Sequence, residues 1–349
     1  KYLSTGFRLN LLFGLFFALF VIWIGKPFIS FLNVQNEWVE LQGYAYLVVS
    51  SPMLIFSFFN FWYTRVFNSF GQNKMALKIS AIGVVLNIML DPLFIYTFKL
   101  GVLGAGLATL IANVVMTLCF YIKSKQLFQL DLTAKYGVST YLKMIRLGLP
   151  MSSQRLLFTL VSIFLAKMIT SFGTEAIAAQ KIGLQIESIT YMVIGGLNGA
   201  IASFIGQNYG AKNFNRIKEG VRVAIIIGLL YALLTTVLFL VFPKSLARCF
   251  VTDRQTIEIT ANYLRIVGLT QVFMAIEIIF NGAFVGLGMP KIPATISIVF
   301  TAARIPMAWL FTQWMGVNGI WLSISVSMVL KGILAAYVYY KKGKEGIMD

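Results

Sequence analysis

Val223–Phe242 reads VAIIIGLLYALLTTVLFLVF, a run of 20 residues without a charged side chain. A helix needs about 20 apolar residues to cross a hydrocarbon core about 30 Å thick. The run is continuous and does not alternate between apolar and polar residues, so it predicts a membrane-spanning helix and not a barrel strand. Similar runs recur along the chain and are separated by short polar breaks. They predict an integral membrane protein made of helices.

The composition supports the same class. The 349 residues are 58% hydrophobic and 12% charged, whereas soluble domains average roughly 25% charged residues. The net charge of +17 would suggest nucleic-acid binding in a soluble protein. In a helical membrane protein, basic residues gather in cytoplasmic loops and fix the orientation, so we expect a lipid bilayer and no nucleic acid as the partner.

Histidine is absent from the sequence, and the two cysteines, Cys119 and Cys249, stand far apart. This pattern excludes His/Cys metal sites, CxxC redox chemistry and a disulfide framework. Paired catalytic carboxylates are not visible either. A membrane-embedded enzyme is therefore the disfavoured class, and we expect no cofactor.

Ten apolar stretches are long enough to span a bilayer. The loops between them alternate in charge: one set carries Lys123, Arg146 and Arg216, and the other carries Glu40 and Glu175. The positive-inside rule places the basic set, and both ends of the chain, in the cytoplasm. The ten predicted spans are 7–32, 44–70, 75–98, 102–124, 143–172, 175–208, 218–242, 256–287, 292–315 and 317–340.

An internal repeat links the two parts of the chain. Gly71 recurs as Gly288 at an offset of 217, and Gly104 recurs as Gly319 at an offset of 215. The steady offset predicts a duplication in which both copies run in the same direction across the membrane. The second copy has two more spans than the first. We therefore expect twelve helices in the whole protein, of which ten are present, and about 75 further residues before this chain begins.

The predicted fold class is an all-α integral membrane protein: a two-lobe helical bundle of parallel six-helix repeats. The first lobe comprises residues 1–125, the cytoplasmic linker residues 126–142, and the second lobe residues 143–349. Transporters built from such repeats place the substrate between the lobes, near the middle of the bilayer.

Asp91 is an acid that falls well inside a predicted span, where an ionisable group is costly and indicates function. Asn87 precedes it by four residues and shares its helix face, and Pro92 removes a backbone donor and loosens the helix. Asp91 lies nine residues before the turn near Leu100 and Thr109 nine after it, so both lie about 13 Å below the outer surface. Carboxylate, amide and hydroxyl oxygens at one level predict a site for Na⁺ or a proton. Alternatively, Asn87 and Thr109 only satisfy one another.

The second lobe offers a different set of polar side chains within its spans. The span 175–208 is unusually polar, which indicates that it lines a water-filled cavity or packs against other helices through its glycines. The acids of this set have a structural alternative, in which a buried Lys or Arg such as Arg304 or Lys331 neutralises them. The candidate substrate-cavity residues are Gln180, Gln185, Glu187, Met192, Asn198, Glu277 and the first-lobe Phe59.

Arg304 stands near the position in the second copy that corresponds to Asn87, and no acid stands near the position of Asp91. A cation site of this kind is therefore confined to the first lobe.

These motifs resemble those of MATE (multidrug and toxic compound extrusion) transporters. Gly206-Gln-Asn-Tyr-Gly210-Ala-Lys-Asn213 with Arg216 is similar to the signature at the end of that family's eighth helix, and Asn87-x-x-x-Asp91-Pro-Leu-Phe and Arg304-Ile-Pro306 are similar to other family patterns. The resemblance implies two six-helix lobes and drug export driven by Na⁺ or H⁺ entry. It also implies that Asn87, Asp91 and Thr109 hold the coupling ion together with an Asp on the missing first helix. After Gly148-Leu-Pro150 the next acid is Glu175, so a family acid on the seventh helix is absent.

The predicted function is a multidrug efflux antiporter that exports organic, often cationic, compounds in exchange for Na⁺ or H⁺ by alternating access of its lobes. The expected location is the bacterial or archaeal inner membrane, and the expected state is a monomer. The alternative is a lipid-linked oligosaccharide flippase of the same superfamily, which needs a cationic cavity; Arg65, Arg155, Lys167 and Arg304 keep it open.

Overall fold

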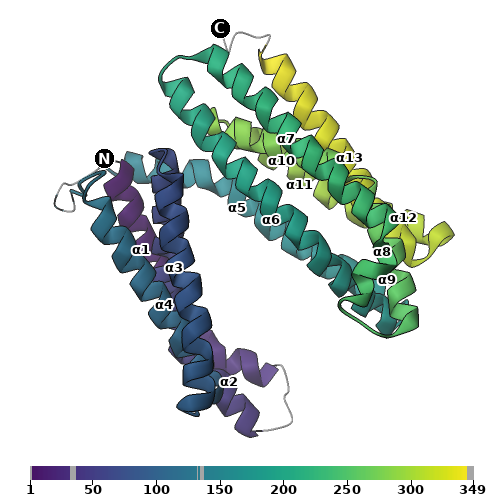
Figure 1. Cartoon of the computed structure of the whole chain (residues 1–349), viewed down its shortest axis with the longest axis horizontal. Helices are drawn as coiled ribbons and strands as arrows, with labels where there is room; N and C mark the ends of the chain where they lie inside the picture. Colours follow the sequence, from purple (N-terminus) through teal and green to yellow (C-terminus); the bar gives the residue numbers. More distant parts are fainter. Residues whose placement is uncertain (1, 32–36, 132, 134–136, 344–349) are drawn as a thin grey trace. The chain divides into compact units, whose positions relative to one another are not determined.

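The computed structural model covers residues 1–349 and describes all of them except 1, 32–36, 132, 134–136 and 344–349 (Figure 1). The described residues form helices joined by short segments, and they contain no strand. The chain divides into two compact units, Lys1–Met144 and Ile145–Asp349. Residues 132 and 134–136 of the predicted linker lie outside the described residues.

The first unit is built on α2, which packs against α1 along one side and against α4 along another, while α3 packs on α4. Its core is aromatic: the rings of Tyr63 and Phe120 stack with centroids 5.6 Å apart, and Phe67 meets Phe120 edge-on at 5.2 Å. Its elements are α1 (Tyr2–Phe31), α2 (Glu37–Ser69), α3 (Asn73–Pro92), the π-helix η1 (Leu93–Thr97) and α4 (Gly101–Ser124).

The second unit surrounds α10, which packs against α6, α7 and α13. α5 (Val138–Thr170) starts within the first unit and continues into the second. The remaining elements are α6 (Thr174–Gly210), α7 (Phe214–Val241), α8 (Pro243–Arg248), α9 (Arg254–Gly268), α10 (Gln271–Gly286), α11 (Lys291–Ala302), α12 (Arg304–Met315) and α13 (Val317–Lys342).

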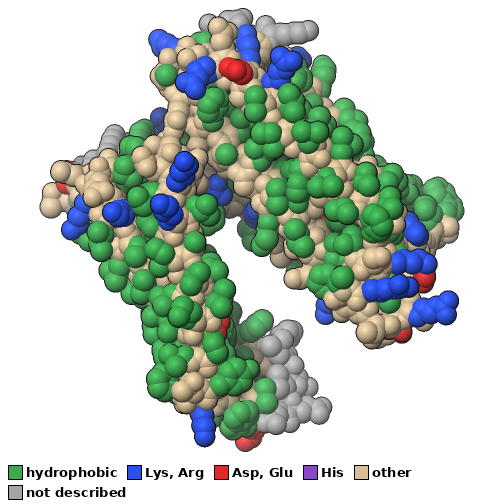
Figure 2. Space-filling model, in the orientation of Figure 1, with side chains coloured by type: hydrophobic (Ala, Val, Ile, Leu, Met, Phe, Trp, Pro, Cys, Tyr) green, Lys and Arg blue, Asp and Glu red, His purple; other side chains and the backbone are tan. Residues whose placement is uncertain are grey.

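The predicted spans correspond to these helices. Among the described residues, nine helices or helix pairs are long and apolar enough to cross a membrane, and the bent pair α9–α10 is a tenth candidate. On the visible face of each unit, hydrophobic side chains cover most of the surface, and Lys and Arg gather toward the ends (Figure 2). Side chains as large as Trp23 and Trp314 are 75% exposed. A surface of this kind is suited to lipid contact.

The predicted span 256–287 is one continuous helix, whereas the structure breaks it into α9 and α10, which meet at 53°. The freed backbone at the break has other partners. The Thr270 hydroxyl donates to the Val267 carbonyl at 3.0 Å, and the Thr236 hydroxyl of α7 donates to the Gly268 carbonyl at 3.0 Å. Hydroxyl groups that bond to nearby carbonyls in this way compete with the helix ladder.

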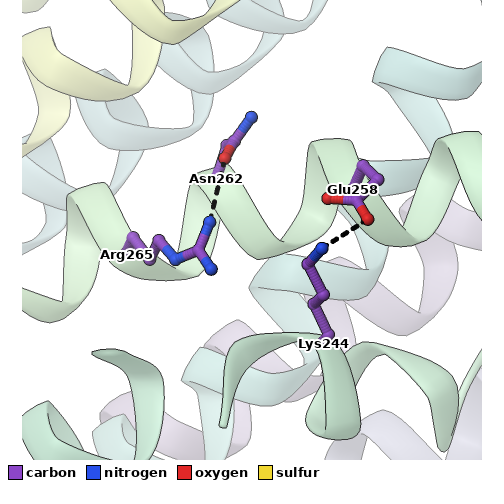
Figure 3. Close-up of polar contacts among 4 residues, drawn as sticks. All are labelled: Lys244, Glu258, Asn262 and Arg265. Carbon is purple, nitrogen blue, oxygen red and sulfur yellow. Dashed lines mark hydrogen bonds and ion pairs between the residues drawn. The ribbon is translucent and has the colours of Figure 1, made fainter. Parts of the chain in front are cut away.

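α9 begins at one end of the second unit and presents a polar face. Lys244 of α8 forms an ion pair with Glu258, and Arg265 donates to Asn262 at 3.4 Å (Figure 3). Asp253 is the residue before the helix, and its Oδ2 accepts hydrogen bonds from the Thr256 hydroxyl and backbone N–H, each at 2.7 Å. These bonds lower the pKa of the Asp253 carboxyl below its ordinary value. Asp253 therefore caps the start of α9.

The predicted repeat is visible in the backbone. Gly71 and Gly288 occupy equivalent turns with φ of 74° and 75°, a region that glycine enters without strain. A Cβ on Gly104 would lie 2.8 Å from the Phe94 carbonyl carbon, and one on Gly319 would lie 2.4 Å from that of Phe311. Only glycine permits these approaches, and both units use one at the same place. In each unit, therefore, the last helix starts directly against the end of the preceding span.

Candidate ion and ligand sites

The structure brings Asn87, Asp91 and Thr109 together in the first unit. The Asn87 side-chain N–H group lies 3.4 Å from an Asp91 carboxylate oxygen and 3.3 Å from the Thr109 hydroxyl oxygen. All three residues are half-buried. The juxtaposition expected from their spacing around the Leu100 turn is confirmed as a contact. In this arrangement Thr109 also donates to its own helix, at the Ala105 carbonyl, with a distance of 2.9 Å.

Pro92 shapes the backbone beside this cluster. Because proline has no N–H, it cannot donate to the carbonyl of Ile88, and the α-helix gives way to the wider π-helix η1 directly after it. The turn that follows has positive φ at Lys99 (55°) and Gly101 (53°). These features return α4 alongside α3, which sets Thr109 opposite Asn87.

Among the described residues, no Lys or Arg forms an ion pair with Asp91. A carboxylate inside a span without a basic partner favours a mobile cation or a proton as its counter-charge. Carboxylate, amide and hydroxyl oxygens are the ligands that hard cations such as Na⁺ prefer. Asn87 would turn its amide oxygen toward such an ion, since amide groups can present either end.

A polar network missed by the sequence analysis extends from this cluster to α2. The Asn113 side chain donates to the Thr109 carbonyl at 2.9 Å and accepts from Asn60 at 3.0 Å, while Thr117 donates to Asn60 at 2.8 Å. Asn60 is 4% exposed. The spacing of 109, 113 and 117 is a stripe along one helix face, and it is the signal that could have revealed the network.

Glu187 and Gln180 lie on α6 in the second unit, and both have partners. Glu187 accepts from the Tyr263 hydroxyl at 2.7 Å and from Gln271 at 3.4 Å, and Gln180 accepts from the Trp321 indole N–H at 2.6 Å. Gly183, one turn before Glu187, makes room for the Tyr263 ring, because a Cβ there would lie 2.3 Å from it. Helix packing through a glycine, an alternative kept open for this span, is therefore observed at Gly183.

Glu277 and Asn198 serve internal contacts of the second unit. Glu277 lies 3.9 Å from the Lys331 ammonium, and both side chains are buried. This is the structural alternative in which a buried base neutralises the acid. Asn198 donates to the Ile278 carbonyl at 2.6 Å and so ties α6 to α10.

The remaining candidate substrate residues are scattered. Gln185 is exposed, Met192 is 77% exposed, and Phe59 is 7% exposed with its ring 4.7 Å from that of Phe7 in the core of the first unit. The proposal that these three side chains line a substrate cavity stays a prediction.

A cavity of about 180 Å³ lies within the second unit. Its walls include Phe158, Gln180, Glu187, Tyr263 and Arg304. Gln180 and Glu187 were predicted substrate-cavity residues, whereas Arg304 was predicted as a charge partner and as a cationic residue of the flippase alternative. Tyr263 was not among the predicted site residues, because its position in the sequence does not show where its hydroxyl points.

Long apolar helices that enclose acids, amides and a guanidinium define the class: a multi-pass helical membrane transporter. The chain belongs to the MATE family, since the family model described as MatE matches residues 1–93 and 150–310.

Individual relatives agree with this assignment. The chain is 27% identical over 327 residues to a protein of Thermotoga maritima named probable multidrug resistance protein NorM, with 90% of this chain and 69% of that protein covered. It is 32% identical over 298 residues to a protein of the same name from Mannheimia succiniciproducens, with 78% and 63% covered. The chain thus spans about two thirds of the length of these curated relatives.

A crystal structure of a mutant of the Vibrio cholerae MATE transporter VcmN superimposes with a TM-score of 0.91. The two chains are 25% identical, and the match covers 99% of this chain and 80% of that one. The two-lobe MATE fold predicted from the sequence is therefore confirmed.

Proposed function

We propose that this protein exports small organic compounds in exchange for Na⁺ or H⁺, which binds at Asp91 with Asn87 and Thr109. The single observation that carries the proposal is the contact of these three side chains at 3.4 and 3.3 Å, inside a span and without a basic partner for Asp91 among the described residues. The multidrug resistance names of the relatives support organic compounds as the cargo.

In this mechanism, binding of the ion changes the structure of the first unit and so competes with binding of the exported compound. A cation at Asp91 would draw Asn87 and Thr109 around itself and replace the Asn87–Thr109 hydrogen bond that links α3 to α4. Thr109 is joined through Asn113 to Asn60 of α2, so a change at the ion site reaches a second helix. Alternating access of the two lobes then releases the cargo outside and the ion inside.

The proposed setting is the inner membrane of a prokaryotic cell, with the basic loops and both ends of this chain in the cytoplasm. The protein is proposed to act as a monomer and to need no cofactor beyond the coupling ion. The flippase alternative is less favoured, because these relatives carry multidrug names.

The test is Asp91→Asn, which keeps the size and the Asn87 contact but removes the charge. We expect the variant to insert and fold normally and to lose drug resistance in an efflux-deficient host, together with ion-driven drug uptake by inverted vesicles. Glu258→Gln is the matched control, because it makes the same change at an exposed acid and should leave both activities intact. Full resistance in Asp91→Asn would show that the ion site is assigned wrongly.

A further inference from the structure

Arg304 is a buried cation that forms no close ion pair with an acid among the described residues; Glu187 acts on it only through longer-range electrostatics. The residue is 5% exposed, and its Nε donates to the Ser327 hydroxyl at 2.7 Å. Its guanidinium carbon lies 5.9 Å from the centroid of the Phe158 ring. Guanidinium groups carry five N–H donors, and burying one without a counter-charge is costly. The remaining donors of Arg304 are therefore suited to a ligand.

The cavity beside Arg304 has room for a small aromatic ring. Its volume is about 180 Å³, and a cavity of ~150 Å³ with apolar walls holds benzene. Phe158, Tyr191 and Tyr263 contribute aromatic faces to the wall. A largely apolar wall with a few placed polar and charged groups is the usual design of a small-molecule pocket.

The charge balance of the wall favours an anion. Lys181 and Arg304 contribute two positive charges, and Glu187 is the acid that lines the same cavity. Both Glu187 oxygens already accept hydrogen bonds, one from Tyr263 and one from Gln271. Glu187 is therefore occupied by donors of its own unit, whereas the outer nitrogens of Arg304 have no hydrogen-bond partner among the described residues.

We propose that the second unit binds a small aromatic carboxylate in this cavity. The carboxylate accepts two parallel hydrogen bonds from the planar guanidinium of Arg304, a geometry that arginine forms and lysine does not. The ring of the ligand packs on Phe158 and Tyr191, the two aromatic side chains of the wall that are accessible. This site lies wholly within the second unit and selects an anion, so it goes beyond the cation site of the first unit and does not depend on it.

The test uses three ligands of one size and different charge: benzoate, benzyl alcohol and benzylammonium. Each is titrated by calorimetry into the purified full-length protein in detergent. We expect benzoate to bind at least tenfold more tightly than the other two, because only benzoate has a carboxylate that accepts two hydrogen bonds from the Arg304 guanidinium. If benzylammonium binds as tightly as benzoate, the proposal is overturned.

Arg304→Gln should weaken benzoate binding by roughly ten- to a hundredfold, because it removes a charged hydrogen-bond pair. Arg265→Gln is the matched control at an exposed arginine and should leave the affinity unchanged. Unchanged affinity in Arg304→Gln would overturn the proposal. Should Arg304→Gln fail to fold, Arg304→Lys is the second variant: it keeps the positive charge and should still lose most of the benzoate affinity.

The cation site is tested separately in the same experiment. Asp91→Asn should bind benzoate as the parent does, because it lies in the other unit. Loss of transport in Asp91→Asn with intact benzoate binding would thus support both proposals. Loss of benzoate binding in Asp91→Asn would contradict the independence of the two sites.

Discussion

The next-to-last spans of the two repeats carry opposite charges, which stand about one helical turn apart when the repeats are aligned. In the first unit, Asn87 and Asp91 stand on α3, and Asn87 reaches Thr109 on α4 at 3.3 Å. In the second unit, the residues 217 positions later are Arg304 and Ala308 on α12. Arg304 reaches across to α13 and donates to Ser327 at 2.7 Å.

Both spans are interrupted, although not at the same level. In the first unit the α-helix changes to a π-helix after Pro92, and in the second the span divides into α11 and α12 just before Arg304. In each unit one polar side chain bridges to the last helix of the repeat. What differs is the chemistry: oxygen groups around a carboxylate in one copy and a guanidinium in the other. The fold provides the position, and the side chains determine which sign of charge each proposed site would bind.

The units also differ in whether an acid inside a span has a basic partner. Lys331 neutralises Glu277 in the second unit, whereas Asp91 has no such partner among the described residues. Lys331→Met leaves Glu277 buried and unpaired, and we expect it to lower the free energy of unfolding by ~3 kcal/mol. Denaturant titration in mixed micelles measures this. Lys331→Met combined with Glu277→Gln should recover most of the loss. A single variant as stable as the parent would show that the pair contributes nothing.

In both units a glycine near the start of the last helix packs against the backbone of the preceding span, and the distance is shorter in the second unit. Gly319→Ala places a Cβ 2.4 Å from the backbone of Phe311, and Gly104→Ala places one 2.8 Å from that of Phe94. Backbone atoms move only at a cost, so we expect destabilisation of ~2 kcal/mol for Gly319→Ala and less for Gly104→Ala. The melting temperature in detergent ranks the two variants.

Gly195→Ala is the control for this pair, because a Cβ at Gly195 meets no described atom within 4 Å. It should be neutral or slightly stabilising, as expected for alanine in a helix. If Gly104→Ala proves the more damaging variant, the two turns are not packed as the structure has them.

The contact of Asn87, Asp91 and Thr109 was predictable because it depends on local geometry. Asn87 and Asp91 are one helical turn apart, and a short turn fixes the level of Thr109 on the next helix. The repeat was predictable for a similar reason, because Gly71 and Gly288 hold backbone conformations that only certain residues adopt easily.

The contacts of the second unit were not predictable in the same way. Glu277 and Lys331 are 54 residues apart on α10 and α13, and whether they meet depends on how each helix is rotated about its axis. A helix that is apolar all round has no amphipathic pattern to reveal that rotation. The break at Gly268 was missed because its stabilising partner, Thr236, comes from another helix.

Thr109→Val tests whether the Thr109 hydroxyl, which bonds to Asn87 across α3 and α4, belongs to the proposed ion site. The change removes one oxygen ligand from the proposed ion site at constant volume. We expect a roughly tenfold increase in the cation concentration needed for half-maximal exchange, in line with loss of one hydrogen-bond-like contact to a charge. Thr312→Val is the matched control, since the Thr312 hydroxyl likewise bonds to its own helix, at Trp309, but is exposed. An unchanged cation dependence in Thr109→Val would remove Thr109 from the site.

The smallest expected effect concerns how helices start in the two units. Gln72 precedes α3 without a capping side-chain bond, whereas Asp253 caps α9. The hydrogen bonds from Thr256 hold the pKa of Asp253 below its ordinary value of 3.8. The charged cap therefore stabilises the fold at pH values above 3.8, and that stabilisation is lost as the pH falls through the folded-state pKa.

Asp253→Asn isolates this effect, because asparagine caps a helix without titrating. The difference in melting temperature between parent and variant should be constant above about pH 5 and should move toward the variant in more acidic solution. Since Asp253 is exposed, the change should be a small fraction of that seen for Lys331→Met. A difference that stays constant down to about pH 3 would mean that the carboxylate does not form the capping bonds in solution.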